Sequence, residues 1–256
     1  MTPQLGETTA AVTFLELIAH DLRWGILEEL GRSDLRVNEL ITRLGQPGNL
    51  VSYHLGKLRA NGLVHERHSS ADGRAVYYSL DIERFQRQMV EAASRIRPGL
   101  VAVRPPGPAA RRWRSQARIL FLCTHNSARS QMAEGLLRAA AGDRVTVKSA
   151  GSQPKDVHPL AVEAMDRREI DIRDQRPTPV GQLKGQRFDF VVTLCDTMRE
   201  VCPRFSGTPE LLHWSLPDPA AEPAERQRPA FEEVADEIAR RVAYLVILLD
   251  EMLAVT

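Results

Sequence analysis

The sequence has few cysteines, few aromatic residues and almost no net charge. Three cysteines in 256 residues do not make a secreted disulfide scaffold, so we expect reducible thiols in a cytoplasmic protein. The formal net charge of +1 gives no electrostatic sign of a nucleic-acid partner, so such a partner has to be argued from local pattern. The longest apolar run, residues 242–249, is far shorter than the roughly 20 residues of a membrane span. The first ten residues lack the basic stretch and apolar core of a signal peptide, so we expect no membrane partner.

Proline and arginine are concentrated in one short stretch near the middle of the chain. Residues 98–117 contain four prolines and four arginines, and they contain no acidic residue. Proline fixes its own φ angle and disfavours helix at the residue before it. We therefore predict a linker at 98–117 between two domains, 1–97 and 118–256. A solubilising tether explains its arginines more simply than contacts to DNA phosphates.

The first domain reads as several short helices followed by one hairpin. Apolar residues at helical spacing predict two helices within 14–30, and further helices at 37–44 and 49–61. Strands are expected at 63–68 and 74–80, joined through Asp72 and Gly73 in a tight turn, before a last helix at 81–95. This order is that of a mainly α-helical winged helix-turn-helix domain.

The helix at 49–61 is the expected recognition helix, because the second helix of such a motif enters the major groove. We place Leu50, Val51, Leu55 and Leu58 on its apolar face. The alternative, a solvated helix in a small all-α domain, does not explain the hairpin that follows. The candidate contacts to double-stranded DNA are Asn49, Ser52, Tyr53, His54, Lys57, Arg59 and, past the wing tip, Arg74.

Residues 51–55 (Val-Ser-Tyr-His-Leu) and 58–64 (Leu-Arg-Ala-Asn-Gly-Leu-Val) resemble the ArsR family of dimeric metalloregulatory repressors. The resemblance covers about residues 10–95. It implies a DNA-binding homodimer formed partly by the first and last helices of the domain. The family commonly senses arsenite through cysteines, or zinc through histidine and aspartate. No cysteine precedes Cys123 here, so we assign no metal ligands and leave the inducer open.

In the second domain, a strand, a loop and a helix surround the first cysteine. The apolar run at 118–122 leads into Cys123, and a helix is expected at 130–141. Loop N–H groups and a helix N-terminus bind oxyanions, and the planar guanidinium of Arg129 adds two donors. The same positive field favours the Cys123 thiolate, whereas a buried structural cysteine is the alternative. The expected oxyanion-binding residues are Thr124, His125, Asn126, Ser127, Ala128, Arg129 and Ser130.

The rest of the domain alternates between strands and helices. Strands at 145–149, 189–194 and 211–214 alternate with helices at 159–168, 196–202 and 231–253. This alternation predicts an α/β fold with a small parallel sheet flanked by helices. Cys195 ends one apolar run and Cys202 follows seven residues later, so two more thiols are available for a redox cycle. Asp218, between two prolines, is the candidate proton donor, with a simple turn as the alternative.

Residues 123–135 (Cys-Thr-His-Asn-Ser-Ala-Arg-Ser-Gln-Met-Ala-Glu-Gly) resemble the thioredoxin-coupled arsenate reductases, which share the low-molecular-weight tyrosine phosphatase fold. Residues 149–151, 191–195, 202–203, 213–214 and 218–220 also match, so the resemblance spans about 118–253. It implies that Cys123 attacks arsenate while Asp218 protonates the leaving hydroxyl. Cys195 then displaces arsenite and forms a disulfide with Cys123. Cys202 next attacks Cys195, and thioredoxin or a similar dithiol reduces the resulting disulfide.

The resemblance implies no tightly bound cofactor. Some relatives bind potassium beside the loop, and Asn126, Glu134 and Ser149 match that site. An acidic ligand is replaced at Thr178, so potassium is not expected here.

The predicted segment between the two later cysteines also sets a geometric condition. Seven residues of intact helix rise ~10.5 Å, whereas the α-carbons of a disulfide lie within ~7 Å. A helix at 196–202 would therefore have to unwind to join Cys195 and Cys202.

The sequence thus predicts a bifunctional arsenic-resistance protein, a DNA-binding regulator fused to an arsenate reductase. A low-molecular-weight tyrosine phosphatase is one alternative, although Ala220 and Ala221 stand where such enzymes typically carry aromatic residues. The other alternative is a non-catalytic regulator that uses the thiol domain to sense an oxyanion or a redox change.

Overall fold

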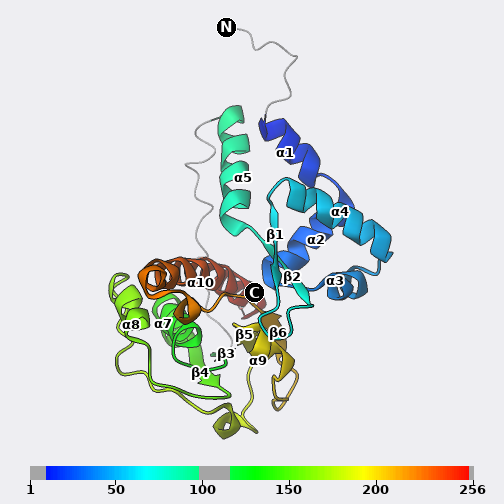
Figure 1. Ribbon diagram of the computed structural model, residues 1–256. Helices are drawn as coiled ribbons and strands as arrows, with labels where there is room; N and C mark the ends of the chain where they lie inside the picture. The colour runs from blue at the N-terminus through cyan, green and yellow to red at the C-terminus, as the bar shows by residue number, and fades with distance from the viewer. Residues whose placement is uncertain (1–9, 98–115, 254–256) are drawn as a thin grey trace. The chain divides into compact units, whose positions relative to one another are not determined.

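The computed structural model describes residues 10–97 and 116–253, and the side chains up to residue 250. The described residues form two compact units, each made mainly from one half of the chain (Figure 1). Most of the expected linker lies outside the described residues, so the domain bounds 1–97, 98–117 and 118–256 stay a prediction. No helix within the described residues is long and apolar enough to span a membrane.

The first unit is a winged helix-turn-helix, as the sequence predicts. Its helices are α1 (Ala10–Ile18), α2 (Asp21–Arg32), α3 (Val37–Leu44), α4 (Gly48–Ala60) and α5 (Ile82–Ile96), with the wing strands β1 (Val64–His68) and β2 (Val76–Leu80) before α5. The strands pair antiparallel from Val64 opposite Leu80 to His68 opposite Val76. The wing turn therefore spans 69–75 and is longer than the tight two-residue turn expected at Asp72 and Gly73. Gly73 still adopts a left-handed φ of 68° within it.

The core of the first unit is made by one face of each helix. Ile26, Leu40, Val51 and Leu58 are fully buried there. The buried face of α4 differs from the expected one, because it consists of Val51, His54, Leu55 and Leu58. Leu50 is exposed instead. Positions 51, 54, 55 and 58 follow the i, i+3, i+4, i+7 spacing of a single helix face, and position 50 falls outside it.

The second unit is a parallel sheet with helices packed against it. Its strands are β3 (Ala117–Cys123), β4 (Val145–Gly151), β5 (Phe190–Thr193) and β6 (Glu210–His213), in the order β4-β3-β5-β6. All three strand pairs are parallel, which confirms the predicted α/β fold. Residues 119–122 of β3 are all fully buried, as expected for a strand covered on both faces.

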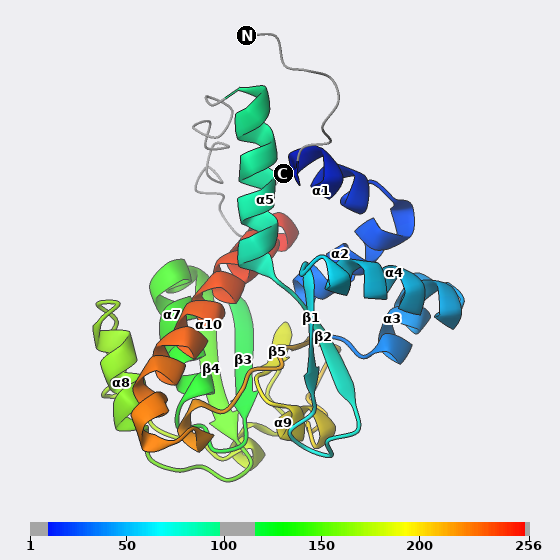
Figure 2. The same cartoon turned by 45° about the horizontal axis from the view of Figure 1, so that its top comes forward.

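The helices of this unit are α7 (Arg129–Ala141), α8 (Pro159–Asp166), α9 (Asp196–Glu200) and α10 (Ala224–Leu253), with short 3-10 turns at Gly142–Arg144, Val180–Leu183 and Pro219–Ala221. Helices α7, α8 and α10 pack against one another, and Figure 2 shows them together beside β3 and β4. Helix α9 packs against β3 and β5.

Candidate active site

The candidate site lies where two neighbouring strands end. Cys123 is the last residue of β3, and Cys195 follows β5 after one further residue. Because β3 and β5 are adjacent and parallel, with Leu122 opposite Thr193, their carboxyl ends lie at the same edge of the sheet. In open α/β sheets this edge is where ligands bind. The topology therefore brings together two thiols that are 72 positions apart in the chain.

The Cys123 sulfur is buried and contacts two polar groups. The side chain is 2 % exposed, and the backbone N–H of Asn126 donates a hydrogen bond to Sγ over 3.1 Å. The Ser130 hydroxyl lies 2.9 Å from the same sulfur, in the first turn of α7. Polar contacts at these positions hold the sulfur at the base of the loop, where it can act as a nucleophile.

One segment, residues 153–158, hydrogen-bonds to the backbone carbonyl groups of the loop that follows Cys123. The carbonyls of Thr124, His125 and Ser127 accept hydrogen bonds of 2.8–2.9 Å from the backbone N–H groups of Gln153, Lys155 and His158. A loop whose carbonyls are engaged on one side leaves its N–H groups free to line an anion site. This bracing segment was not predicted, because its contacts are backbone contacts and leave no residue-type signature.

Asn126 fixes the shape of the loop. Its φ of 46° is left-handed, a conformation that asparagine tolerates better than most residues. Its side-chain amide donates to the hydroxyls of Ser130 (2.9 Å) and Ser149 (2.8 Å), and its Oδ1 accepts from the N–H of Thr178 (2.7 Å). Gln131 donates to the Asn126 carbonyl over 2.9 Å.

The residues that match a potassium site in relatives do not fit one here. The Asn126 oxygen and the Ser149 hydroxyl take part in the hydrogen bonds above, and Glu134 forms an ion pair with Arg138. Thr178 contributes a backbone N–H, a donor, where a cation needs an oxygen ligand. We therefore assign no cation to this position.

Arg129 and Asp218 meet at the mouth of the loop. The Arg129 side chain is buried, and its Nη1 donates to the Leu216 carbonyl over 3.0 Å. Its Nη2 lies 3.3 Å from Oδ2 of Asp218, whose side chain is 37 % exposed. The Ala220 N–H donates to the other carboxylate oxygen of Asp218, which holds the acid in place at the start of a 3-10 turn. The structure thus brings together the two groups expected to bind the oxyanion and to donate a proton.

The second cysteine is poised beside the loop. The Cys195 Sγ lies 3.3 Å from the Thr124 hydroxyl, next to Cys123. Burial raises the pKa of the Cys195 thiol. His125, another residue of the loop, has a pKa lowered by burial and next by the charge of Lys155, so the neutral imidazole is favoured there. None of the three cysteines forms a disulfide.

Cys202 is half-buried, and burial raises the pKa of its thiol as well. It lies beyond the end of α9, because the helix ends at Glu200 rather than at the expected residue 202. Pro203 disfavours helical geometry at Cys202, which explains the earlier end. The condition derived for a seven-residue helix therefore does not apply, and the segment between the two cysteines is only partly helical.

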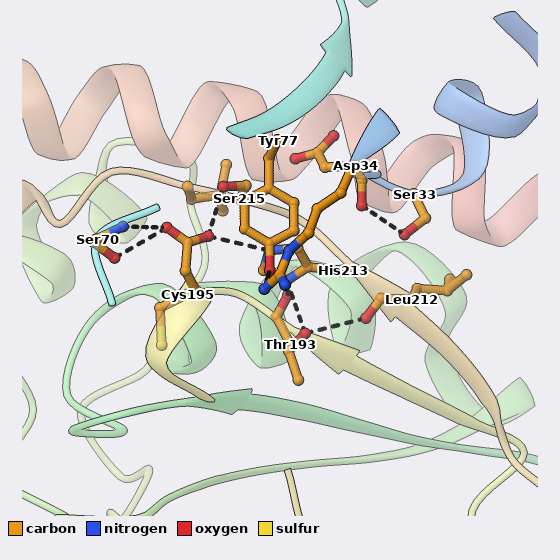
Figure 3. A network of polar contacts seen from close by, with 12 residues as sticks. Ser33, Asp34, Ser70, Tyr77, Thr193, Cys195, Leu212, His213 and Ser215 are labelled. Atoms are coloured by element: carbon orange, nitrogen blue, oxygen red, sulfur yellow. Dashed lines mark hydrogen bonds and ion pairs between the residues drawn. The ribbon is translucent and has the colours of Figure 1, made fainter. Parts of the chain in front are cut away.

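A buried polar network at the end of β6 was not predicted. Figure 3 shows Thr193, His213 and Ser215 beside Cys195, and the Asp196 carboxylate hydrogen-bonds Ser215 and lies 3.1 Å from His213. The sequence showed the His213–Trp214 pair, but neither Asp196 nor Ser215 carried a signal of its own.

In the first unit, most of the residues that we expect to contact DNA lie at the surface. Asn49, Ser52, Tyr53, Lys57 and Arg59 are exposed on α4, and Arg74 is exposed on the wing. The Lys57 ammonium lies over the Tyr53 ring, and Arg59 forms an ion pair with Glu66.

His54 is the exception, because it is buried and faces α2. Its ring lies 3.3 Å from the Arg23 guanidinium and stacks near His20. Burial and then the charge of His20 lower the pKa of His54. The expectation that His54 contacts DNA is therefore wrong, since its side chain belongs to the packing between α2 and α4.

Comparison with known proteins agrees with this division. Residues 118–254 match the family described as low molecular weight phosphotyrosine protein phosphatase, and residues 20–75 match the MarR family. The first unit is a winged helix-turn-helix domain, and its match is to the MarR family, whereas its sequence motifs resemble the ArsR family.

Individual relatives match the second unit. An arsenate reductase of Halalkalibacterium halodurans is 44% identical over 126 residues, which cover 48% of this chain and 91% of that protein. An arsenate reductase of Bacillus anthracis is 40% identical over 124 residues, 48% of this chain and 90% of that protein. Among solved structures, a thioredoxin-dependent arsenate reductase of Corynebacterium glutamicum is 30% identical with a TM-score of 0.42, covering 54% of this chain and 63% of that one.

Proposed function

This chain belongs to the low molecular weight phosphotyrosine protein phosphatase family through residues 118–254, and from this membership we propose that its second unit reduces arsenate to arsenite with three thiols. The observation that carries the proposal is the position of Cys195, whose sulfur lies against Thr124 of the Cys123 loop. A phosphatase needs only one thiol at this site. The relatives that are 40–44% identical are named arsenate reductases, which supports the same substrate.

In the first step, the Cys123 thiolate attacks arsenic(V) and forms a sulfur–arsenic bond. Arg129 and the loop N–H groups hold the remaining oxygens, and their positive charge offsets the charge that develops on them. The hydroxyl that departs takes a proton from Asp218 and leaves as water. The 3.3 Å between Arg129 and Asp218 places both groups on the same small ligand.

In the second step, Cys195 attacks the sulfur of Cys123. A sulfur–sulfur bond forms, the sulfur–arsenic bond breaks, and its electron pair stays on arsenic, which leaves as arsenite. The two thiols are oxidised by two electrons and arsenic is reduced by two, so the step balances. Cys195 has to lose its proton first, and its raised pKa makes this loss the demanding part of the step.

In the third step, Cys202 attacks Cys195 and releases the Cys123 thiolate. The disulfide now joins Cys195 and Cys202, and a dithiol carrier such as thioredoxin reduces it by the same exchange chemistry. Cys202 suits this role because it is half-buried beyond the end of α9, with the exposed Val201 beside it.

The test of this function compares two reactions of one protein. We expect arsenite to accumulate when arsenate, thioredoxin and a thioredoxin-reducing system are supplied, and Cys202→Ser to abolish this turnover. Hydrolysis of an aryl phosphate requires only Cys123, Arg129 and Asp218, so Cys202→Ser should leave it unchanged. Phosphate release without any arsenite from the wild type would favour the phosphatase alternative.

For the first unit, the MarR-type fold supports a role as a transcriptional regulator that binds double-stranded DNA through α4 and the wing. The third reading, a regulator whose thiol domain only senses, predicts that arsenate, arsenite or oxidant changes DNA affinity while no arsenite is made. Fluorescence anisotropy with an operator fragment under each condition, next to the arsenite assay, separates this reading from a bifunctional protein.

The first unit also supports a homodimer. Apolar side chains are exposed on both terminal helices, Val12 and Leu15 on α1 and Met89 and Val90 on α5. Helices α1 and α5 pack together, so these residues offer a shared apolar surface to a second copy. We expect a dimer in analytical ultracentrifugation and a monomer for Val90→Asp. A wild-type monomer at micromolar concentration would contradict this assignment.

A further inference from the structure

The buried network beside Cys195 has no part in the steps above, and it is centred on one carboxylate. Asp196 is the first residue of α9 and is fully buried. Its Oδ1 accepts a hydrogen bond of 2.6 Å from the Ser215 hydroxyl and lies 3.1 Å from Nε2 of His213. A buried carboxylate is costly unless it is hydrogen-bonded, and these bonds supply that support.

His213 connects this carboxylate to the other side of Cys195. Its Nδ1 lies 2.9 Å from the Thr193 hydroxyl and 3.2 Å from the Thr193 carbonyl. Because a carboxylate only accepts, Nε2 carries the proton that faces Asp196. Thr193 and Asp196 flank Cys195 in the chain, and both are thereby tied to one fully buried ring at the end of β6.

This arrangement fixes the backbone on both sides of Cys195. The sulfur lies 3.3 Å from the hydroxyl of Thr124, the residue that follows Cys123. We propose that Asp196 is a positioning residue for the second thiol: through His213 and Ser215, which Figure 3 shows beside Cys195, it holds Cys195 at the Cys123 loop. The proposal rests on the three-thiol function, and it adds a residue that acts on only one step.

The proposal predicts that loss of Asp196 affects the attack of Cys195 on Cys123 but not the attack of Cys123 on arsenate. The hydrogen bonds of Asp196 and His213 described above run to each other, to Thr193 and to Ser215, so we expect the attack of Cys123 on arsenate to proceed without them. The attack of Cys195 on Cys123 does depend on them, because displacing a reacting atom by about 1 Å costs on the order of 100-fold in rate. A purely structural role would affect both steps together.

The test uses the full chain with Cys202→Ser, which stops the reaction at the Cys123–Cys195 disulfide. One measurement follows the rate of that disulfide and of arsenite release in a single turnover by rapid quench and mass spectrometry. The second measures alkylation of Cys123 by iodoacetamide and its protection by inorganic phosphate, which reports the loop alone. The variants are Asp196→Ala and Asp196→Asn, with Thr197→Ala as an exposed control in the same helix.

We expect Asp196→Ala to slow disulfide formation by about 10- to 100-fold while alkylation of Cys123 and its protection by phosphate stay within about twofold. Asp196→Asn, which keeps an acceptor oxygen, should recover much of the rate, and Thr197→Ala should match the parent. If Asp196→Ala does not fold, Ser215→Ala removes the 2.6 Å bond and should slow the same step.

Equal disulfide rates in the parent and in Asp196→Ala, or in Ser215→Ala where that variant replaces it, would overturn the proposal. A parallel loss of Cys123 reactivity would overturn it also, because the effect would then be general. If the parent itself makes no arsenite and no disulfide, the three-thiol function fails, and the proposal fails with it for that distinct reason.

Discussion

Gly151 is the position where one added carbon is expected to disable the site. It is the last residue of β4 and pairs with Cys123 at the end of β3. A Cβ placed on Gly151 would lie 2.6 Å from the Thr124 carbonyl oxygen and 2.9 Å from the Asn126 nitrogen. Ordinary contact begins at 3.4 Å, so Gly151→Ala has to push the loop away by about 0.8 Å.

The displaced atoms belong to the loop that holds the Cys123 sulfur through the Asn126 N–H. Overpacking of this kind usually costs about 1–3 kcal/mol of folding free energy. Displacement of a catalytic group by about 1 Å costs on the order of 100-fold in rate. We therefore expect Gly151→Ala to fold with reduced stability and to lose activity by roughly that factor.

The assay combines urea unfolding with arsenite formation and with binding of phosphate to the loop. Gly181→Ala is the matched control, because a Cβ at Gly181 meets nothing within 4 Å and lies in the same unit. It should leave stability and activity near the wild-type values. Full activity and unchanged stability in Gly151→Ala would refute the account of how the loop is supported.

Three further predictions concern charge. Burial raises the pKa of Cys195, so single-turnover arsenite release should keep rising with pH beyond the ordinary thiol pKa of about 8.5; a rate that levels off by pH 8 would contradict this. Burial lowers the pKa of His54, so its contribution to stability is fully present above the unfolded pKa of about 6.5 and is lost as pH falls towards the folded value. Urea midpoints should therefore drop more between pH 7.5 and 5.5 for the wild type than for His54→Gln, and equal drops would argue against burial. Lys57→Ala should weaken DNA binding and lower the slope of log affinity against log salt by about 1, and an unchanged slope would remove Lys57 from the interface.

Sequence pattern was sufficient to predict those parts of the structure that are made by consecutive residues. The loop from Cys123 to Arg129 lies between an apolar strand and a helix, and all three elements are continuous in sequence. Both fold classes followed from the same kind of evidence, because helical spacing and strand alternation are local properties. The position of Cys195 beside the loop came from the resemblance and from the parallel order of β3 and β5.

Contacts between elements that are distant in the chain determine the features that the sequence did not predict. Leu50 and His54 exchanged their expected positions on α4, because Arg23 of α2 gives the buried His54 a polar partner. Asp196 reads as an ordinary helix-starting acid until β6 brings His213 and Ser215 to it from 17 and 19 positions away. Pairings of this kind depend on the fold and not on neighbouring residues.

The central claim is that Cys123 and Cys195 together supply the two electrons that reduce arsenate. The most direct measurement is arsenite released in a single turnover, without any external reductant, by pre-reduced protein. The account predicts about one arsenite per chain for the wild type and for Cys202→Ser, and none for Cys123→Ser or Cys195→Ser. Arsenite formed by Cys195→Ser in the same amount as by the wild type would contradict it.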